Sequence, residues 1–207
     1  ADKFPLEASV KYLVLSAAAS GILLFGMALI YAQTGTLEFS SIVNVTKETP
    51  GLGTGFAIVA LIMVFIGIAF KLSLAPFHMW TPDVYEGSPT SVTSFFSTVP
   101  KIAGIAVFIR FMYSPFYEII DQWQFILVFI SIASMILGAV AAIGQNNIKR
   151  LIAYSSIGHI GYAIAGIASG TENGFKSTLT YILIYAAMNI GIFAFVFLMK
   201  RKGKYVE

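Results

Sequence analysis

Phe56-Ala-Ile-Val-Ala-Leu-Ile-Met-Val-Phe-Ile-Gly-Ile-Ala-Phe-Lys71 is an apolar run typical of a membrane-spanning helix, and it ends in a lysine. A second lysine, Lys101, stands between Val99-Pro100 and the apolar residues 102–108. A cationic side chain near the centre of a bilayer costs roughly 2.5–3.5 kcal/mol on insertion scales, so chains rarely keep one without a use for it. With His78 and His159 at membrane depth, the lysines predict a path for protons or cations.

The composition predicts a membrane protein. Of the 207 residues, 57% are hydrophobic and 11% are charged, and the mean hydropathy is +0.83. A soluble domain usually has about 25% charged residues. The absence of cysteine excludes disulfides and iron–sulfur clusters within the chain. The net charge of +3 does not indicate nucleic acid as a partner, because the excess lies at the ends of predicted helices.

The apolar segments predict a single transmembrane domain over residues 1–207, an all-α polytopic helix bundle with about six spans. About 20 apolar residues cross the hydrocarbon, and inside lipid only a helix satisfies its own backbone amides. We expect residues 33–50, which include Thr34-Gly35-Thr36 and Pro50-Gly51, to form an ordered or partly mobile surface connection. The expected helices cover about 9–32, 53–80, 90–113, 122–144, 148–169 and 176–199.

Two prolines are expected to interrupt this pattern. The second segment is too long for one straight crossing, and Pro76 predicts a discontinuous helix that breaks around Leu74-Ala75-Pro76. Pro100, directly before Lys101, predicts a second defect. Broken helices at membrane depth are tolerated where the freed carbonyls meet water, ions or protein, and transporters often place their sites there.

The distribution of Lys and Arg predicts the orientation. With six crossings, the side that carries both termini holds eight of these residues, the opposite side holds three, and Lys71 and Lys101 lie in the membrane. The bias predicts that both ends face the cytoplasm or matrix. We expect the membrane itself to be a bacterial plasma membrane or an organellar inner membrane. The eight are Lys3, Lys11, Lys149, Arg150, Lys200, Arg201, Lys202 and Lys204, and the three are Lys47, Arg110 and Lys176.

The chain lacks an initiator methionine and a signal peptide, so we expect a processed chain or part of a longer polypeptide.

Lys71 and Lys101 are the main candidate site residues. An amine held between desolvation and a nearby carboxylate can load and release a proton as its surroundings change. The alternative for Lys71 is snorkelling to the interface, but Trp80 lies nine residues away, about 13 Å along a helix. The alternative for Lys101, which lies mid-span, is a structural ion pair with a partner helix.

The two histidines are the next candidates, because histidine titrates near neutrality. His78 follows Lys71 by seven residues, so an unbroken helix would place both on one face, although a structural histidine near the interface is equally ordinary. His159 shares a face with Ser155 and Tyr162, and a satisfied core histidine is its alternative. A polar stripe on the last helix is expected to supply its neighbours or to line water, although such stripes are more often packing. The stripe consists of Thr178, Tyr181, Tyr185 and Asn189.

Charged residues near the helix ends are weaker candidates. Glu7 and Lys11 stand at i and i+4 and predict an interfacial pair, with proton entry as the less favoured interpretation. Four acidic residues, Asp83, Glu86, Glu118 and Asp121, are interpreted as solvated. The sequence has no glycine-rich phosphate loop, HExxH zinc motif or nucleophile elbow, so we expect no redox or metal chemistry in the chain itself.

Three motifs carry a resemblance to a known family. The stretch Phe70-Lys-Leu-Ser-Leu-Ala-Pro-Phe-His-Met-Trp-Thr-Pro-Asp-Val-Tyr-Glu-Gly-Ser-Pro-Thr90, with Val99-Pro-Lys-Ile-Ala103, resembles the subunit N family of proton-pumping NADH:quinone oxidoreductase, respiratory complex I. So does Asn146-Asn-Ile-Lys-Arg-Leu-Ile-Ala-Tyr-Ser-Ser-Ile-Gly-His-Ile-Gly-Tyr162. The related L, M and cation/proton antiporter subunits carry Leu-Pro-Asp-Ala-Met where this chain has Thr81-Pro-Asp-Val-Tyr85.

The resemblance implies roles for the matching residues. Lys71 resembles the central lysine of a discontinuous helix, and Lys101 the next lysine along a hydrophilic axis to which His78 and His159 also belong. Lys11 matches a family lysine at the start of its helix. Family subunits are longer. The glutamate that pairs with the central lysine lies in a helix outside this stretch, and so does a separate lysine on the exit side of the path. The resemblance therefore covers the central part of such a subunit.

The function implied is proton translocation by a non-redox, antiporter-like subunit of the NADH:quinone oxidoreductase enzyme. The NADH, FMN, iron–sulfur clusters and quinone of that complex would lie in other subunits, and the partners would be its other membrane subunits and the lipid bilayer. A sodium/proton antiporter subunit is one alternative, against which the Thr81–Tyr85 motif argues. A non-conducting membrane scaffold, with static ion pairs at the lysines, is another.

Overall fold

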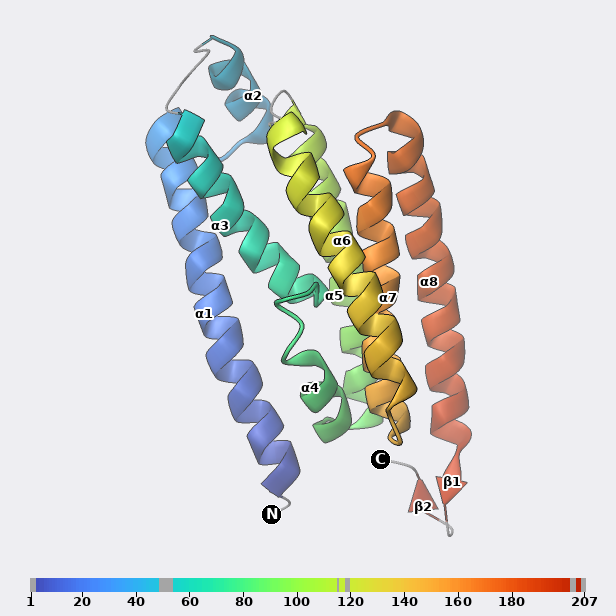
Figure 1. Ribbon diagram of the computed structural model, residues 1–207. Helices are drawn as coiled ribbons and strands as arrows, with labels where there is room; N and C mark the ends of the chain where they lie inside the picture. Colours follow the sequence, from blue (N-terminus) through green and yellow to red (C-terminus); the bar gives the residue numbers. More distant parts are fainter. Residues whose placement is uncertain (1–2, 49–53, 115, 118–119, 202–203, 206–207) are drawn as a thin grey trace.

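The computed structural model describes residues 3–48, 54–114, 116–117, 120–201 and 204–205. These residues form a bundle of long helices that ends in a short antiparallel hairpin (Figure 1). The predicted all-α transmembrane bundle is confirmed, and the hairpin is an addition to it. The elements are α1 (Lys3–Thr34), α2 (Phe39–Glu48), α3 (Thr54–Leu72), α4 (Thr81–Gly87), α5 (Thr90–Tyr113), α6 (Ile120–Ile143), α7 (Ile148–Ala168), α8 (Glu172–Leu198), β1 (Lys200–Arg201) and β2 (Lys204–Tyr205).

Five helices, α1 and α5 to α8, are long and apolar enough to cross a bilayer. The described apolar part of α3, Ile58–Leu72, is shorter. It is followed by a turn segment and the short helix α4, so these pieces together occupy the predicted segment 53–80 and a little beyond. The chain is a multi-pass membrane protein with one interrupted crossing.

The interruption lies where Pro76 predicted it, although the helix ends earlier, at Leu72. Ser73 has a positive φ of 61°, which turns the backbone out of the helix. Two side chains then satisfy backbone groups at the break: Ser134 of α6 accepts from the Ala75 amide at 2.9 Å, and Trp80 donates to the Phe70 carbonyl at 2.9 Å. These bonds satisfy two backbone groups at the break, as a polar interruption inside a membrane requires. The Ser73 hydroxyl and the His78 Nδ1 are buried without a hydrogen-bond partner among the described residues.

Residues 39–48 of the expected surface connection are ordered as the helix α2, where Glu38 binds the hydroxyls of Ser40 and Ser41 and Ile42 is buried. The second expected defect is not seen, because α5 runs from Thr90 to Tyr113 with Pro100 inside it. Part of the expected connection, Pro50-Gly51, lies outside the described residues.

The tightest packing in the bundle joins α6 and α7 through glycines. A Cβ atom built on Gly138 of α6 would lie 2.6 Å from the backbone nitrogen of Gly158 on α7, so no larger residue fits there. Ser131 donates to the Gly161 carbonyl at 2.8 Å across the same contact. Small residues with a bridging hydroxyl are the usual means of joining helices in lipid. This contact fixes α7, which carries two site residues.

The beginning of α1, the short helix α4 and the end of α8 lie at one end of the bundle, and α2 lies at the other (Figure 1). This arrangement agrees with the predicted even number of crossings. We call the end that contains α4 the terminal end. Some residues counted for the orientation have side chains or positions outside the described part of the chain, among them Lys3, Lys200, Arg201, Lys202 and Lys204.

Candidate functional site

Lys101 lies in the interior of the bundle. Its side chain is 0% exposed, and its Nζ donates to the Ser156 hydroxyl of α7 at 2.7 Å. Ser156 in turn donates to the Ala153 carbonyl at 2.8 Å. The Lys101 Nζ also lies 5.7 Å from the centroid of the Tyr85 ring, which α4 carries. Within the described residues no carboxylate forms an ion pair with Lys101, so its neighbours are a hydroxyl and an aromatic face.

More polar groups surround this amine. Tyr185 of α8 is 2% exposed and donates to the Ser97 carbonyl at 3.0 Å, in the turn where Pro100 removes an amide from α5. Asn189, one turn further along α8, is also 2% exposed. The Tyr85 hydroxyl and the Asn189 amide nitrogen are buried without a hydrogen-bond partner among the described residues. Buried polar groups of this kind are usually satisfied by ordered water. We call Lys101, Tyr85, Ser156, Tyr185 and Asn189 the Lys101 site.

His159 extends the polar row along α7. Its Nδ1 is hydrogen-bonded to the Tyr181 hydroxyl at 2.7 Å, and its ring centroid lies 5.5 Å from that of Tyr185. The stripe on the last helix thus supplies the neighbours of His159, as its spacing predicted. Thr178, at one end of the stripe, instead donates to the Ala163 carbonyl at 3.2 Å and serves helix packing. Tyr162 is 55% exposed, so it does not share the interior with His159.

Lys71 and His78 lie at the break, apart from the Lys101 site. Lys71 is in the last turn of α3, is exposed on the surface of the chain, and has no hydrogen bond or ion pair within the described residues. His78 is half-buried in the segment between α3 and α4. Because α3 ends at Leu72, the two side chains do not share a helix face. The structure thus brings Lys101 and His159 into one polar row and leaves Lys71 on an outer face.

A group of charged residues lies at the terminal end, where α1, α4 and α7 meet. Lys11 binds Glu7 at 2.7 Å, as the spacing predicted, and also binds Asp83 at 2.9 Å. Arg150 binds Asp83 at 2.8 Å and Glu86 at 3.0 Å. We call Glu7, Lys11, Asp83, Glu86 and Arg150 the end cluster. Each acidic residue of α4 in it faces a cation from another helix.

The sequence interpretation of Asp83 and Glu86 as solvated loop residues is wrong. Both belong to α4, and their side chains are only 25% and 24% exposed. Their i, i+3 spacing was the available signal, since it places them on one helical face. Their partners, Lys11 and Arg150, come from distant parts of the sequence, which spacing cannot reveal. Asp121 is exposed as expected, and Glu118 lies outside the described residues.

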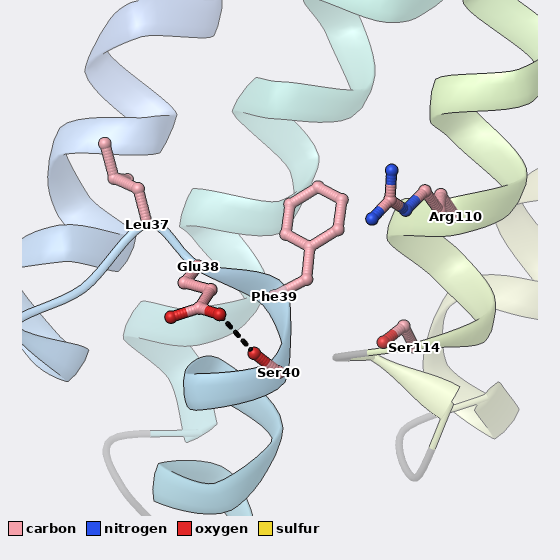
Figure 2. A pocket seen from close by; sticks show the side chains of 6 residues that line it. All are labelled: Leu37, Glu38, Phe39, Ser40, Arg110 and Ser114. Carbon is pink, nitrogen blue, oxygen red and sulfur yellow. Dashed lines mark hydrogen bonds between the residues drawn. The ribbon is translucent and has the colours of Figure 1, made fainter.

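A groove of about 460 Å³ lies at the opposite end of the bundle, between the start of α2 and the end of α5 (Figure 2). Arg110 extends toward Phe39 across it, with the guanidinium carbon 5.9 Å from the ring centroid. Glu38 lies on its other wall, bound to Ser40. The groove contains none of the lysines or histidines singled out above. In the described parts of the chain, no group of three or more His, Cys, Asp or Glu side chains is placed to hold a metal ion.

The sequence matches a family profile described as "NADH:quinone oxidoreductase/Mrp antiporter, TM" over residues 1–206. It is 54% identical over 201 residues to NADH-quinone oxidoreductase subunit N of Pelagibacter ubique, a match that covers 97% of this chain and 42% of the relative. For the subunit N of Rhodospirillum rubrum the identity is 51%, with 97% and 41% covered. The chain thus spans about two fifths of the length of the curated relatives that it matches.

Solved structures of membrane complexes also superpose on this chain. A chain of respiratory complex I from Thermus thermophilus with bound Aureothin superposes with a TM-score of 0.70 at 38% identity, over 90% of this chain and 40% of that one. A chain of the Mrp complex from Dietzia superposes with a TM-score of 0.78 at 27% identity, over 91% of this chain and 35% of that one.

Proposed function

Because the chain belongs to the NADH:quinone oxidoreductase/Mrp antiporter family of membrane proteins, we propose that it translocates protons as part of a subunit N of NADH:quinone oxidoreductase. In this proposal the polar row through Lys101 and His159 holds protons inside the bundle, and electron transfer elsewhere in the enzyme drives their movement. The observation that supports it best is the Lys101 amine itself, which is fully buried and hydrogen-bonded to a hydroxyl.

The chemistry of the Lys101 site suits proton exchange. A buried ammonium that is locked to a carboxylate exchanges its proton only after the pair separates. A hydroxyl partner such as Ser156 can donate to the neutral amine and accept from the charged one, so it tolerates both states. The unpartnered groups of Tyr85 and Asn189 offer places for water that would carry the proton onward.

Lys71 and His78 have a different place in the proposal. Lys71 is exposed in the last turn of α3, at the end of a broken helix. We infer that other parts of a longer subunit cover this face and provide the acidic partner that the family resemblance implies. His78, in the break, would then stand beside the route that joins Lys71 to the interior.

The remaining features follow from the same proposal. The terminal end would face the cytoplasm or matrix, in agreement with the excess of Lys and Arg near it. The partners would be other membrane subunits of the complex, and its NADH, FMN, iron–sulfur clusters and quinone would be bound by other subunits. This chain would contribute a proton path to the enzyme and no redox centre.

Replacing Lys101 by Met in the full-length subunit of the assembled enzyme tests the proposal. We expect proton pumping driven by NADH in membrane vesicles to fall by at least about tenfold, which corresponds to a change in activation free energy of ~1.4 kcal/mol. Lys71→Ala is expected to reduce pumping similarly. Lys176→Met is the matched control, because Lys176 is 65% exposed in a pair with Glu172.

Unchanged pumping in a fully assembled Lys101→Met enzyme would refute the proposed role. A loss of assembled enzyme, with normal pumping by the part that does assemble, would instead identify the chain as a scaffold whose lysine is structural. Amounts of assembled enzyme are therefore measured beside the pumping rate for every variant.

The superposition on the Mrp complex chain favours a second candidate, exchange of sodium for protons. The discriminating measurement is proton movement in vesicles with and without sodium, in the absence of NADH. Sodium-dependent exchange that disappears in Lys101→Met would favour this second function.

A further inference from the structure

The short helix α4 connects the end cluster with the Lys101 site. One of its faces carries Asp83 and Glu86, which bind Arg150 and are about one quarter exposed. Tyr85, between them in sequence, is 0% exposed and projects toward Lys101. Seven residues of helix therefore connect the end cluster with the buried amine. Any displacement of α4 would move the Tyr85 ring relative to Lys101.

The Tyr85 ring is placed to interact with the ammonium. The Nζ of Lys101 lies 5.7 Å from the ring centroid, within the range in which a cation is attracted to an aromatic face. Thr93 of α5 donates to the Tyr85 carbonyl at 3.0 Å and so links this residue to the helix of Lys101. The Tyr85 hydroxyl has no hydrogen-bond partner among the described residues.

The other groups that face Lys101 are neutral or weakly basic. Ser156 of α7 binds the amine, and His159 follows Ser156 by three residues on the same helix. Tyr185 of α8 binds the Ser97 carbonyl, one turn before Lys101. From α3, Leu72 packs toward Gly104 of α5. No ion pair of Lys101 is seen in the described part of the chain, so its charged state is stabilised by the Ser156 hydroxyl and by the Tyr85 ring.

Taking the proposed function as its basis, we propose that Tyr85 is a positioning residue for Lys101. Its ring face stabilises the ammonium, and the ion pairs of Asp83 and Glu86 with Arg150 hold α4 where the ring can do so. The proton affinity of the interior is thereby coupled to an ionic contact at the membrane surface, through a helix of seven residues.

The experiment measures NADH-driven proton pumping against pH in vesicles that contain the assembled enzyme. In Tyr85→Leu the ammonium loses its aromatic partner, so we expect the alkaline limb of the curve to move to lower pH by about 0.5–1 unit. Tyr85→Phe keeps the ring and loses only the hydroxyl, so we expect a lower pumping rate with the midpoint of the alkaline limb unmoved. Asp83→Asn weakens one contact that holds α4 and is expected to shift the curve in the same direction by a smaller amount.

Tyr113→Leu is the matched control, because Tyr113 is a partly buried tyrosine whose hydroxyl binds the Ile167 carbonyl, well outside the Lys101 site. A merely structural role for Tyr85 would lower the amount of assembled enzyme without moving the curve. An unmoved curve in Tyr85→Leu, or a shift in Tyr85→Phe as large as in Tyr85→Leu, overturns the inference. If Tyr85→Leu does not assemble, an unmoved curve in Asp83→Asn overturns it.

The Lys101→Met enzyme separates this inference from the function on which it rests. If Lys101→Met pumps normally, the proposed proton path is wrong. If Lys101→Met loses pumping while the Tyr85 and Asp83 variants keep the original curve, only the positioning role fails.

Discussion

The end cluster and the Lys101 site hold their cations in opposite ways. Arg150 lies 2.8 and 3.0 Å from two carboxylates and its side chain is 27% exposed. Lys101 is 0% exposed and its closest polar partner is a neutral hydroxyl at 2.7 Å. Burying an ammonium without a counter-charge is the costlier arrangement. The chain thus pairs the more exposed cation with carboxylates and leaves the buried one on a neutral hydroxyl. This difference is what we expect if Arg150 is structural and Lys101 exchanges protons in the proposed path.

The largest effect is expected from making the interior resemble the end cluster. Ser156→Asp would give Lys101 the carboxylate that Arg150 already has, and the resulting pair would fix the proton on the amine. We expect pumping per assembled enzyme to fall by about tenfold or more, and vesicle pumping assays measure it. The control is Ser155→Asp, since the neighbouring hydroxyl is only partly buried. Normal pumping in assembled Ser156→Asp would remove the distinction between the two regions.

A smaller effect of a different kind is expected when the end cluster loses its guanidinium. Arg150→Gln leaves Asp83 and Glu86 without the cation that joins α4 to α7. Because these side chains are partly exposed, we expect a loss of about 1–2 kcal/mol in stability. A lower midpoint of thermal unfolding of the purified enzyme would show it, with Arg110→Gln at the opposite end as control. An unchanged midpoint would mean that the pairs are not structural.

The smallest effect is expected at the rim of the end cluster. Glu7 is 59% exposed and pairs with Lys11, which keeps Asp83 as a second partner when Glu7 is replaced. Glu7→Gln should therefore leave both pumping and thermal stability within experimental error, because exposed pairs contribute little. A clear loss of pumping in this variant would support the less favoured interpretation of Glu7 and Lys11 as a point of proton entry.

The sequence was informative where a single helix carries the signal. The break near Pro76, the pair of Glu7 with Lys11, and the stripe beside His159 all follow from spacing along one segment. Contacts between distant segments were not predictable in this way. Ser156 beside Lys101 and Arg150 beside Asp83 depend on how α7 packs against α5 and α4, which is decided by the whole bundle.

Two local features were not predicted in detail. The surface connection over 33–50 was expected from Gly35 and the threonines around it, which are typical of turns, and the helix that begins after Glu38 was not foreseen within it. Pro100 was expected to open a defect in α5, but the helix continues through it, and Tyr185 of α8 binds the Ser97 carbonyl in the same turn.

The hydrogen bond between the Ala75 amide and Ser134 has a consequence for biogenesis. The chain is synthesised from its N-terminus, and Ser134 lies 59 positions after Ala75. The Ala75 amide therefore has no bond from α6 until that helix has been made and packed beside it, so the hydrogen bonding of the interrupted segment is completed late.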